Sequence, residues 1–311
     1  MVYRKILNIR DYTPIMYPED HSKIEWMKGL RVPYRTKMEN VKDNVKDLFT
    51  NPFSKSAREW VNKFSEETEY YTFRDFLDDT TSRYREAYSE VENQGEGINI
   101  TSESLPKMHQ QLVDACKTLG IAKIPNYTTD WYYGVHQYSN GEKNYRIVMI
   151  SGSADLLTDS EMLFCLGHEL GHHECGHKPY HMLVECMYMP FINDGLMAAM
   201  ASVIKLPLLE WYRTSDYTAD RVGLLCCQDI NAALSFMIKK AGLPKKCYDS
   251  IDIPSFIDQA RHFDNNFTSI PDKVIKAISI RATEFPWLVA RASKLLEWYE
   301  SGEYQQILDN N

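Results

Sequence analysis

The sequence lacks any cluster of basic residues. Its 35 Lys and Arg residues are outnumbered by 43 Asp and Glu residues, the formal net charge is −8, and the basic residues are scattered along the chain. Proteins that bind nucleic acids usually gather Lys and Arg on one face or along one stripe. The sequence therefore argues against a nucleic acid as a partner, and it leaves the oligomeric state open.

The sequence also lacks any CxxC spacing. Its seven cysteines are odd in number and mostly fall in apolar segments, which favours a reducing compartment. No signal peptide is predicted, because Arg10 and Asp11 follow the first residues before an apolar stretch has formed. We expect a cytoplasmic protein.

An uninterrupted apolar segment long enough to cross a membrane is missing as well. The most apolar part of the chain is residues 181–211, but Pro190 and Asp194 interrupt it, and so does the segment 205–207. A membrane-spanning helix needs roughly 20 apolar residues in a row. We expect a buried or surface-lying pair of helices here, and attachment to a membrane surface is the less favoured alternative.

Residues 1–95 are predicted to form an N-terminal extension. Four prolines within residues 1–53 predict an irregular chain, and aromatic residues at helical spacing predict helices between residues 54 and 92. The segment 93–97, which contains two glycines, marks the boundary. Residues 96–311 are then expected to form one catalytic domain.

The first part of this second domain predicts a helix followed by a hairpin. Residues 106–119 have the apolar spacing of an amphipathic helix. Residues 131–138 and 145–150 are rich in β-formers and flank an Asn-Gly pair, which favours a β-hairpin with His136 on its first strand. We expect an α+β fold that is mainly helical, with a small antiparallel sheet. A lone histidine on a strand is usually structural, so His136 is only a weak candidate for a contact with substrate.

The central motif follows directly. Thr158 and Glu161 match a capping box, which predicts that a helix starts near Ser160 and ends at Gly176. On this helix His168 and His172 lie one turn apart on the same face, with Glu169 between them. This HExxH pattern is typical of zinc hydrolases, in which both imidazoles bind one zinc ion and the glutamate is the general base.

A catalytic zinc site needs a third protein ligand, and the sequence offers several. His177 is the nearest, but Cys175 and Lys178 occupy the positions that the metzincin pattern would fill with Gly and His. Asp216 and Glu210 are acidic candidates at a second predicted helix, which covers residues 212–228; Glu210 lies just before its first residue.

The motifs resemble those of the gluzincin family of HtpX-like heat-shock metalloproteases and CAAX prenyl proteases. The residues that carry the resemblance are Gly167 to His172, Gly176 and His177, and the segment Arg213 to Gly223. The resemblance covers roughly residues 104–299. It implies a zincin-like domain, with the sheet packed on the HExxH helix, that binds one Zn²⁺ ion per chain. It also implies that Asp216 is the third zinc ligand, that Asp220 orients a ligand imidazole, and that the closing motif falls at Phe285, Pro286 and Arg291.

Two departures from the family pattern matter. Asp216 replaces a glutamate, so either the second helix lies closer or zinc is bound more weakly. Phe285 replaces a histidine that helps to stabilise the oxyanion. Arg291 is expected to be either an ion-pair partner or a clamp for substrate, and His173 and His177 are expected to pack at the end of the helix.

The sequence thus predicts a zinc metalloendopeptidase that hydrolyses peptides or unfolded proteins. Zinc activates a water molecule, and Glu169 takes the proton from this water and passes it to the leaving amine. The alternative is a zinc-binding scaffold or regulatory module that has little or no peptidase activity.

Overall fold

The computed structural model describes residues 16–17, 19–20, 22, 24, 31–36, 68–72, 95, 97–130, 137–140, 146–150, 152–178, 180–181, 196–263 and 287–310. The chain divides into two units, one of residues 22–80 and the other of residues 1–21 together with 81–311. The sequence predicts a boundary at residue 95 between an N-terminal extension and a catalytic domain. This division is based on the expected roles of the two segments, and it stays a prediction.

The smaller unit contains a two-stranded antiparallel sheet. Its strands are β1 (Arg31–Thr36) and β2 (Thr68–Thr72), with Arg31 opposite Thr72 and Thr36 opposite Thr68. The prediction of helices between residues 54 and 92 is therefore wrong at β2. Its sequence TEYYT consists mostly of Thr and Tyr, which favour strands, and this preference outweighs the helical spacing of the aromatic residues around it.

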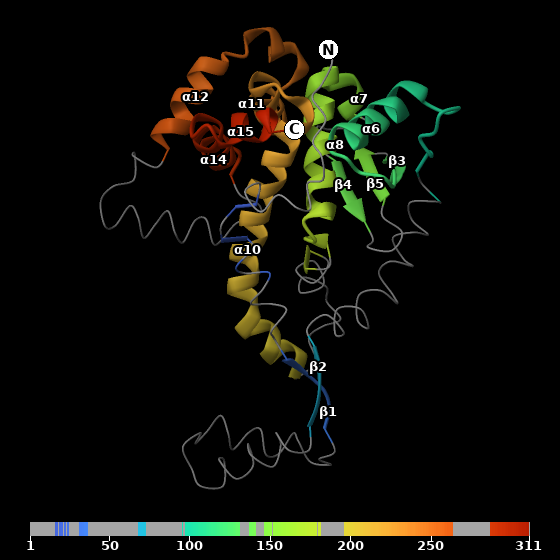
Figure 1. The fold of residues 1–311 in the computed structure, drawn as a ribbon, viewed down its shortest axis with the longest axis vertical. Coiled ribbons are helices and arrows are strands. Elements are labelled where there is room, and N and C mark those ends of the chain that lie inside the picture. Colours follow the sequence, from blue (N-terminus) through green and yellow to red (C-terminus); the bar gives the residue numbers. More distant parts are fainter. Residues whose placement is uncertain are drawn as a thin grey trace. The chain divides into compact units, whose positions relative to one another are not determined.

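The larger unit is mainly helical (Figure 1). Its helices are α6 (Pro106–Thr118), α7 (Gly152–Leu156), α8 (Asp159–Glu174), α10 (Leu196–Cys227), α11 (Ile230–Lys240), the 3₁₀-helix η5 (Lys245–Ser250), α12 (Ile253–His262), α14 (Leu288–Glu300) and α15 (Glu303–Asp309). The predicted α+β, mainly helical class is confirmed. The helix predicted at residues 106–119 corresponds to α6.

The sheet of the larger unit has three strands in the order β3–β5–β4, namely β3 (Asn126–Asp130), β5 (Arg146–Ile150) and β4 (Gln137–Asn140). Strands β4 and β5 are antiparallel, with Gln137 opposite Met149, as the Asn-Gly signal predicts. The prediction of a wholly antiparallel sheet is wrong, because β3 pairs with β5 in parallel. Strand β4 runs opposite to both β3 and β5. Because β5 lies between the other two strands, it is parallel to β3 on one edge and antiparallel to β4 on the other.

The motif helix is α8, and it begins as the capping box predicts. The Thr158 side chain accepts a hydrogen bond from the Glu161 backbone, and Glu161 Oε2 accepts one from the Thr158 N–H at 2.7 Å. The Glu161 carboxylate also accepts a hydrogen bond from Lys239 Nζ at 2.7 Å. These contacts fix the start of α8, and with it the direction in which the motif residues project.

The second helix is longer than predicted. Instead of a break at residues 205–207 and a new helix from residue 212, α10 runs without interruption from Leu196 to Cys227. Proline in a helix removes one backbone hydrogen bond and often only kinks the helix, and here α10 continues through Pro207. Residues 182–195 lie outside the described residues. In the part of the chain that the structure describes, no helix is both long enough and apolar enough to span a membrane.

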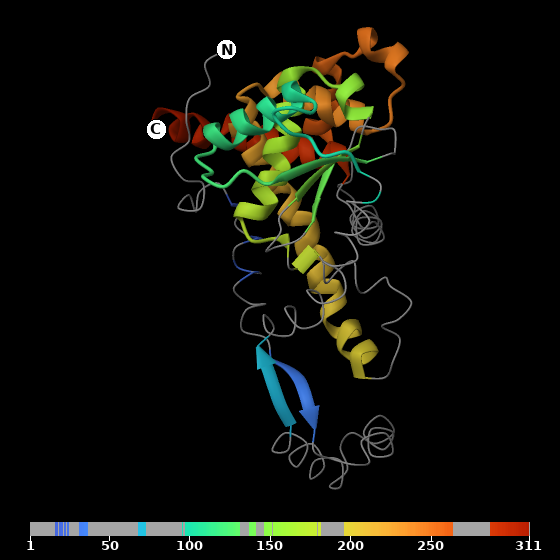
Figure 2. The same cartoon turned by 90° about the vertical axis from the view of Figure 1, so that its right-hand side faces the viewer.

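Helices α8 and α10 run side by side at the centre of the larger unit (Figures 1 and 2). Three glycines lie at their contact. A Cβ atom on Gly167 would lie 2.4 Å from Cys226 Cβ, one on Gly171 2.8 Å from Val222 Cβ, and one on Gly223 2.8 Å from the Phe164 carbonyl oxygen. Such distances are too short for real atoms, so the backbones approach more closely than side chains would allow.

The other elements cover this helix pair. Helix α6 and strand β4 pack on α8, so the predicted packing of the sheet on the motif helix is confirmed, and α14 packs on α10. Buried apolar residues of α6, β5, α8, α10, α11 and α14 contribute to one core, among them Leu112, Ile147, Phe164, Leu170, Val222, Leu225, Phe236, Leu295 and Trp298.

We predict that Gly171→Ala lowers the free energy of unfolding by ~1–3 kcal/mol, the usual cost of overpacking a core. The added methyl group must push Val222, and with it α10, away from α8. Urea unfolding measures the change. Gly95→Ala is the matched control, because a Cβ atom there meets nothing within 4 Å. A Gly171→Ala variant as stable as the wild type would contradict the close helix contact.

Candidate metal centre

The two motif histidines lie close together on α8. Their Nε2 atoms are 3.1 Å apart, and their side chains are almost fully buried. Glu169 is 5% exposed and lies near Lys178, whose Nζ is 3.4 Å from Glu169 Oε2. The helix thus brings two imidazoles to one point with a carboxylate close by in the sequence.

Helix α10 contributes a carboxylate to the same point. Asp216 Oδ1 lies 3.1 Å from His172 Nε2 and 3.7 Å from His168 Nε2. Asp216 is the residue that the resemblance assigns as third ligand, and the structure brings it to both histidines. The shorter arm of aspartate reaches them because the glycines at the helix contact let α10 lie close to α8.

These three atoms fit a tetrahedral metal ion. Bonds of about 2.0–2.1 Å to nitrogen and oxygen ligands place neighbouring ligand atoms about 3.3 Å apart in a tetrahedral zinc site. The observed separations of 3.1, 3.1 and 3.7 Å bracket that value. Two imidazoles and one carboxylate are also a donor set that catalytic metal sites use.

The second ring nitrogen of His168, Nδ1, contacts a carboxylate that forms an ion pair with Arg291. His168 Nδ1 lies 2.9 Å from Asp220 Oδ1, and Arg291 contacts both oxygens of Asp220, through Nε at 2.8 Å and Nη2 at 2.5 Å. All three side chains are buried. Because a carboxylate only accepts hydrogen bonds, His168 donates from Nδ1, which leaves the lone pair of Nε2 directed at the candidate metal position.

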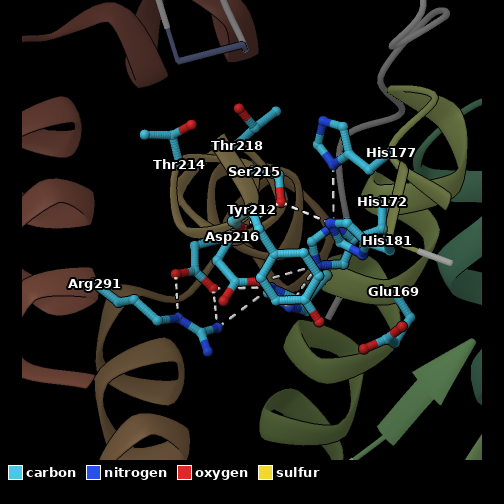
Figure 3. A network of polar contacts seen from close by, with 12 residues as sticks. Glu169, His172, His177, His181, Tyr212, Thr214, Ser215, Asp216, Thr218 and Arg291 are labelled. Carbon is cyan, nitrogen blue, oxygen red and sulfur yellow. Dashed lines mark hydrogen bonds and ion pairs between the residues drawn. The ribbon is translucent and has the colours of Figure 1, made fainter. Parts of the chain in front are cut away.

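The outer nitrogen of His172 contacts another histidine (Figure 3). His172 Nδ1 lies 3.0 Å from His177 Nδ1, and His177 Nε2 lies 2.9 Å from Asp20 Oδ2. His177 and Asp20 are fully buried. His177 was expected to pack at the end of the helix, and it does so directly against a candidate ligand.

A further histidine lies in the same cluster. His181 Nε2 is 2.8 Å from Ser215 Oγ, which itself donates a hydrogen bond to the Tyr212 carbonyl oxygen. The rings of His181 and His172 are in edge contact, with centroids 4.7 Å apart. His172, His177 and His181 therefore form a second group of side chains close enough to hold a metal ion, and this group shares His172 with the first.

The electrostatics favour the protonation states that a metal needs. Burial, followed by the nearby His168, lowers the pKa of His172 well below its usual value, so its ring is neutral at neutral pH. Burial alone would raise the pKa of the Asp216 and Asp220 carboxyls, but the Arg291 guanidinium and His168 together with other nearby groups outweigh it and hold both below their usual value. His172 and Asp216 are thus already deprotonated, as metal binding requires.

The remaining predicted residues have different outcomes. Arg291 has the contacts of an ion-pair partner, which was one of its two expected roles. His173 contacts Glu174 and stays outside the cluster. His136, Phe285 and Pro286 lie outside the described residues.

Sequence reasoning missed several residues of the site. His181 follows His177 at the same four-residue spacing as the motif histidines, which is a signal that could have revealed it. Ser215 and Lys178 carry no such signal. Asp20 lies in a segment predicted to be irregular, and it is 157 residues away from His177 in the sequence.

Comparison with known proteins assigns the chain to a family. Residues 106–298 match Peptidase family M48. The chain belongs to peptidase family M48. The matched residues extend from the start of α6 into α14, close to the predicted extent of 104–299. The narrower assignment to HtpX-like and CAAX prenyl proteases stays a prediction.

The chain is also similar to a curated relative. It is 28% identical over 222 residues to the plastoglobule-localized metallopeptidase 48, chloroplastic, of Arabidopsis thaliana. The match covers 70% of this chain and 64% of the relative, so it spans less than two thirds of that protein's length. No solved structure matches the chain significantly. Cytoplasmic localisation stays a prediction.

We predict that Arg291→Met lowers the free energy of unfolding of the metal-free protein by ~3–5 kcal/mol, because Asp220 is left as a buried, unpaired charge. Urea unfolding in the presence of a chelator measures this. Arg261→Met is the matched control: its partner Glu300 is exposed, and exposed pairs contribute ~0–1 kcal/mol. Equal effects of the two substitutions would show that Asp220 does not depend on Arg291.

Proposed function

We propose that this member of family M48 is a zinc-dependent endopeptidase that cleaves peptides or unfolded proteins. The observation that supports it most is the meeting of His168 Nε2, His172 Nε2 and Asp216 Oδ1 at tetrahedral ligand distances. Zinc is the metal that we expect at two imidazoles and one carboxylate in a hydrolase of this pattern. The match to a metallopeptidase family and to a relative named a metallopeptidase supports the same activity.

When bound, zinc supplies a Lewis acid that polarises the scissile carbonyl and makes water more acidic. The chain's own residues do the rest. Glu169 accepts a proton from the attacking water and later passes it to the leaving amine. Lys178, 3.4 Å from Glu169 Oε2, holds the carboxylate in place beside the centre.

Asp220 and Arg291 keep the first ligand oriented. A carboxylate on the outer nitrogen of a ligand imidazole fixes its tautomer and makes it a better donor. Asp220 does this for His168, and Arg291 keeps Asp220 ionised. The alternative, an inactive zinc-binding module, shares these ligands and differs only in the absence of turnover.

Glu169→Gln is expected to keep one zinc ion per chain and to lower the cleavage of an unfolded protein by ~10²–10⁴-fold, the usual contribution of a general base. Elemental analysis gives the zinc content, and cleavage is compared with and without a chelator. Glu297→Gln, an exposed carboxylate on α14, is the matched control. If Glu169→Gln were as active as the wild type, the role of Glu169 would be wrong. Stoichiometric zinc in a wild-type protein that cleaves no substrate would favour the inactive module.

Asp216→Ala is expected to weaken zinc binding by at least ~100-fold, because it removes a charged ligand. Asp216→Glu keeps the charge, but Asp216 Oδ1 is already at ligand distance from both histidines. The longer arm should therefore overshoot, and binding should be weaker than in the wild type but stronger than in Asp216→Ala. Competition with a chromophoric chelator measures the dissociation constants. Unchanged affinity in Asp216→Ala would exclude this residue as a ligand.

A further inference from the structure

Asp20 is a buried carboxylate outside the part of the chain that matches family M48. It accepts hydrogen bonds from Trp211 Nε1 at 2.8 Å and from Thr218 Oγ1 at 2.6 Å, both on α10. Its third contact is His177 Nε2 at 2.9 Å. Among the residues that the structure describes, His177 is the only basic side chain at ion-pair distance from Asp20.

In each of these contacts, one partner can be assigned as the hydrogen-bond donor and the other as the acceptor. The Thr218 hydroxyl accepts a hydrogen bond from the Tyr17 N–H at 2.9 Å, so its own proton goes to Asp20. Burial alone would raise the pKa of the Asp20 carboxyl, but His177 and the hydrogen bonds outweigh it and hold that pKa below its usual value. Asp20 is therefore an acceptor only, and His177 must donate to it from Nε2.

The contact between His177 and His172 extends the same order of donors and acceptors to the metal centre. The tautomer of His177 that donates to Asp20 from Nε2 offers a lone pair at Nδ1. This atom lies 3.0 Å from His172 Nδ1, so His172 must be the donor there. The lone pair of His172 then lies on Nε2, which is 3.1 Å from His168 Nε2 and 3.1 Å from Asp216 Oδ1.

We propose that Asp20 is a positioning residue of the metal centre, which acts through His177 to hold His172 in the tautomer that binds metal. The inference rests on the proposed zinc site at His168, His172 and Asp216. Asp20 has for His172 the role that Asp220 has for His168, with one imidazole inserted between. Asp20, which lies far from the motif residues in the sequence, is then part of the site.

The need for three acceptor contacts explains why the residue is an aspartate. An asparagine would have to turn its NH₂ group either toward Trp211 Nε1 or toward His177 Nε2, and both of these are donors. In the second orientation His177 must carry its proton on Nδ1. His172 is then forced to carry its proton on Nε2, where it blocks the metal. Asp20→Asn should therefore weaken zinc binding.

The test is a double-mutant cycle on the full-length chain, with the zinc dissociation constant as its readout. We expect Asp20→Asn to weaken zinc binding by ~10-fold, at the lower end of what loss of a partner to a ligand costs. His177→Asn offers an amide oxygen to His172 without any help from Asp20. In that background the further change Asp20→Asn should alter the affinity by less than about twofold, because the two residues act through one path.

Two further variants serve as controls. Asp155→Asn removes an exposed carboxylate that pairs with Lys245 and should leave the zinc affinity unchanged. Trp211→Phe breaks another hydrogen bond to Asp20 and should change the zinc affinity less than Asp20→Asn does. If Asp20→Asn weakens zinc binding equally with and without His177, or if Trp211→Phe has the same effect, Asp20 only supports the fold and the proposal is overturned.

A measurement without any variant tests the same point. In the full-length, metal-free protein labelled with ¹⁵N-histidine, two-bond ¹H–¹⁵N spectra should show His177 protonated on Nε2 and His172 on Nδ1. The opposite tautomers would overturn the proposal. Failure of the proposed function looks different, because the wild-type chain would then bind no zinc while the histidine tautomers stay as stated.

Discussion

The close contact of α8 and α10 is the constraint on which the rest of the site depends. Gly167, Gly171 and Gly223 let the two backbones approach to a distance that any Cβ atom would prevent. This approach brings His168 and His172 on one helix to Asp216 and Asp220 on the other. It also resolves the first departure from the family pattern: the second helix lies close, so an aspartate reaches where a glutamate is expected.

Each candidate histidine ligand is oriented by a carboxylate that acts on its Nδ1 atom, on the side away from the candidate metal position. Asp220, paired with Arg291, contacts His168 directly, and Asp20 contacts His172 through His177. Isolated buried charges are costly, so each carboxylate must be well satisfied. Asp220 is balanced by a guanidinium, whereas Asp20 relies on three hydrogen-bond donors. Asp220 and Asp20 thus have the same orienting role, but their negative charges are stabilised by different groups.

The sequence predicts best what is determined locally. The capping box at Thr158, the course of α8 and the antiparallel pairing of β4 with β5 follow from neighbouring residues, and the structure confirms them. Asp216 and Asp220 could be placed only by resemblance, because nothing in their own segment indicates which face of α10 meets α8. The parallel pairing of β3 with β5 and the contact of Asp20 with His177 depend on segments that are distant in the sequence, for which periodicity gives no signal.

The most direct test of the account is X-ray absorption spectroscopy of the zinc-loaded chain, because it counts the imidazole ligands. His168, His172 and Asp216 predict two imidazole ligands and an oxygen-rich remainder, at distances of about 2.0–2.2 Å. Three imidazole ligands would place the metal at His172, His177 and His181 instead, and would contradict the assignment of Asp216 as a ligand.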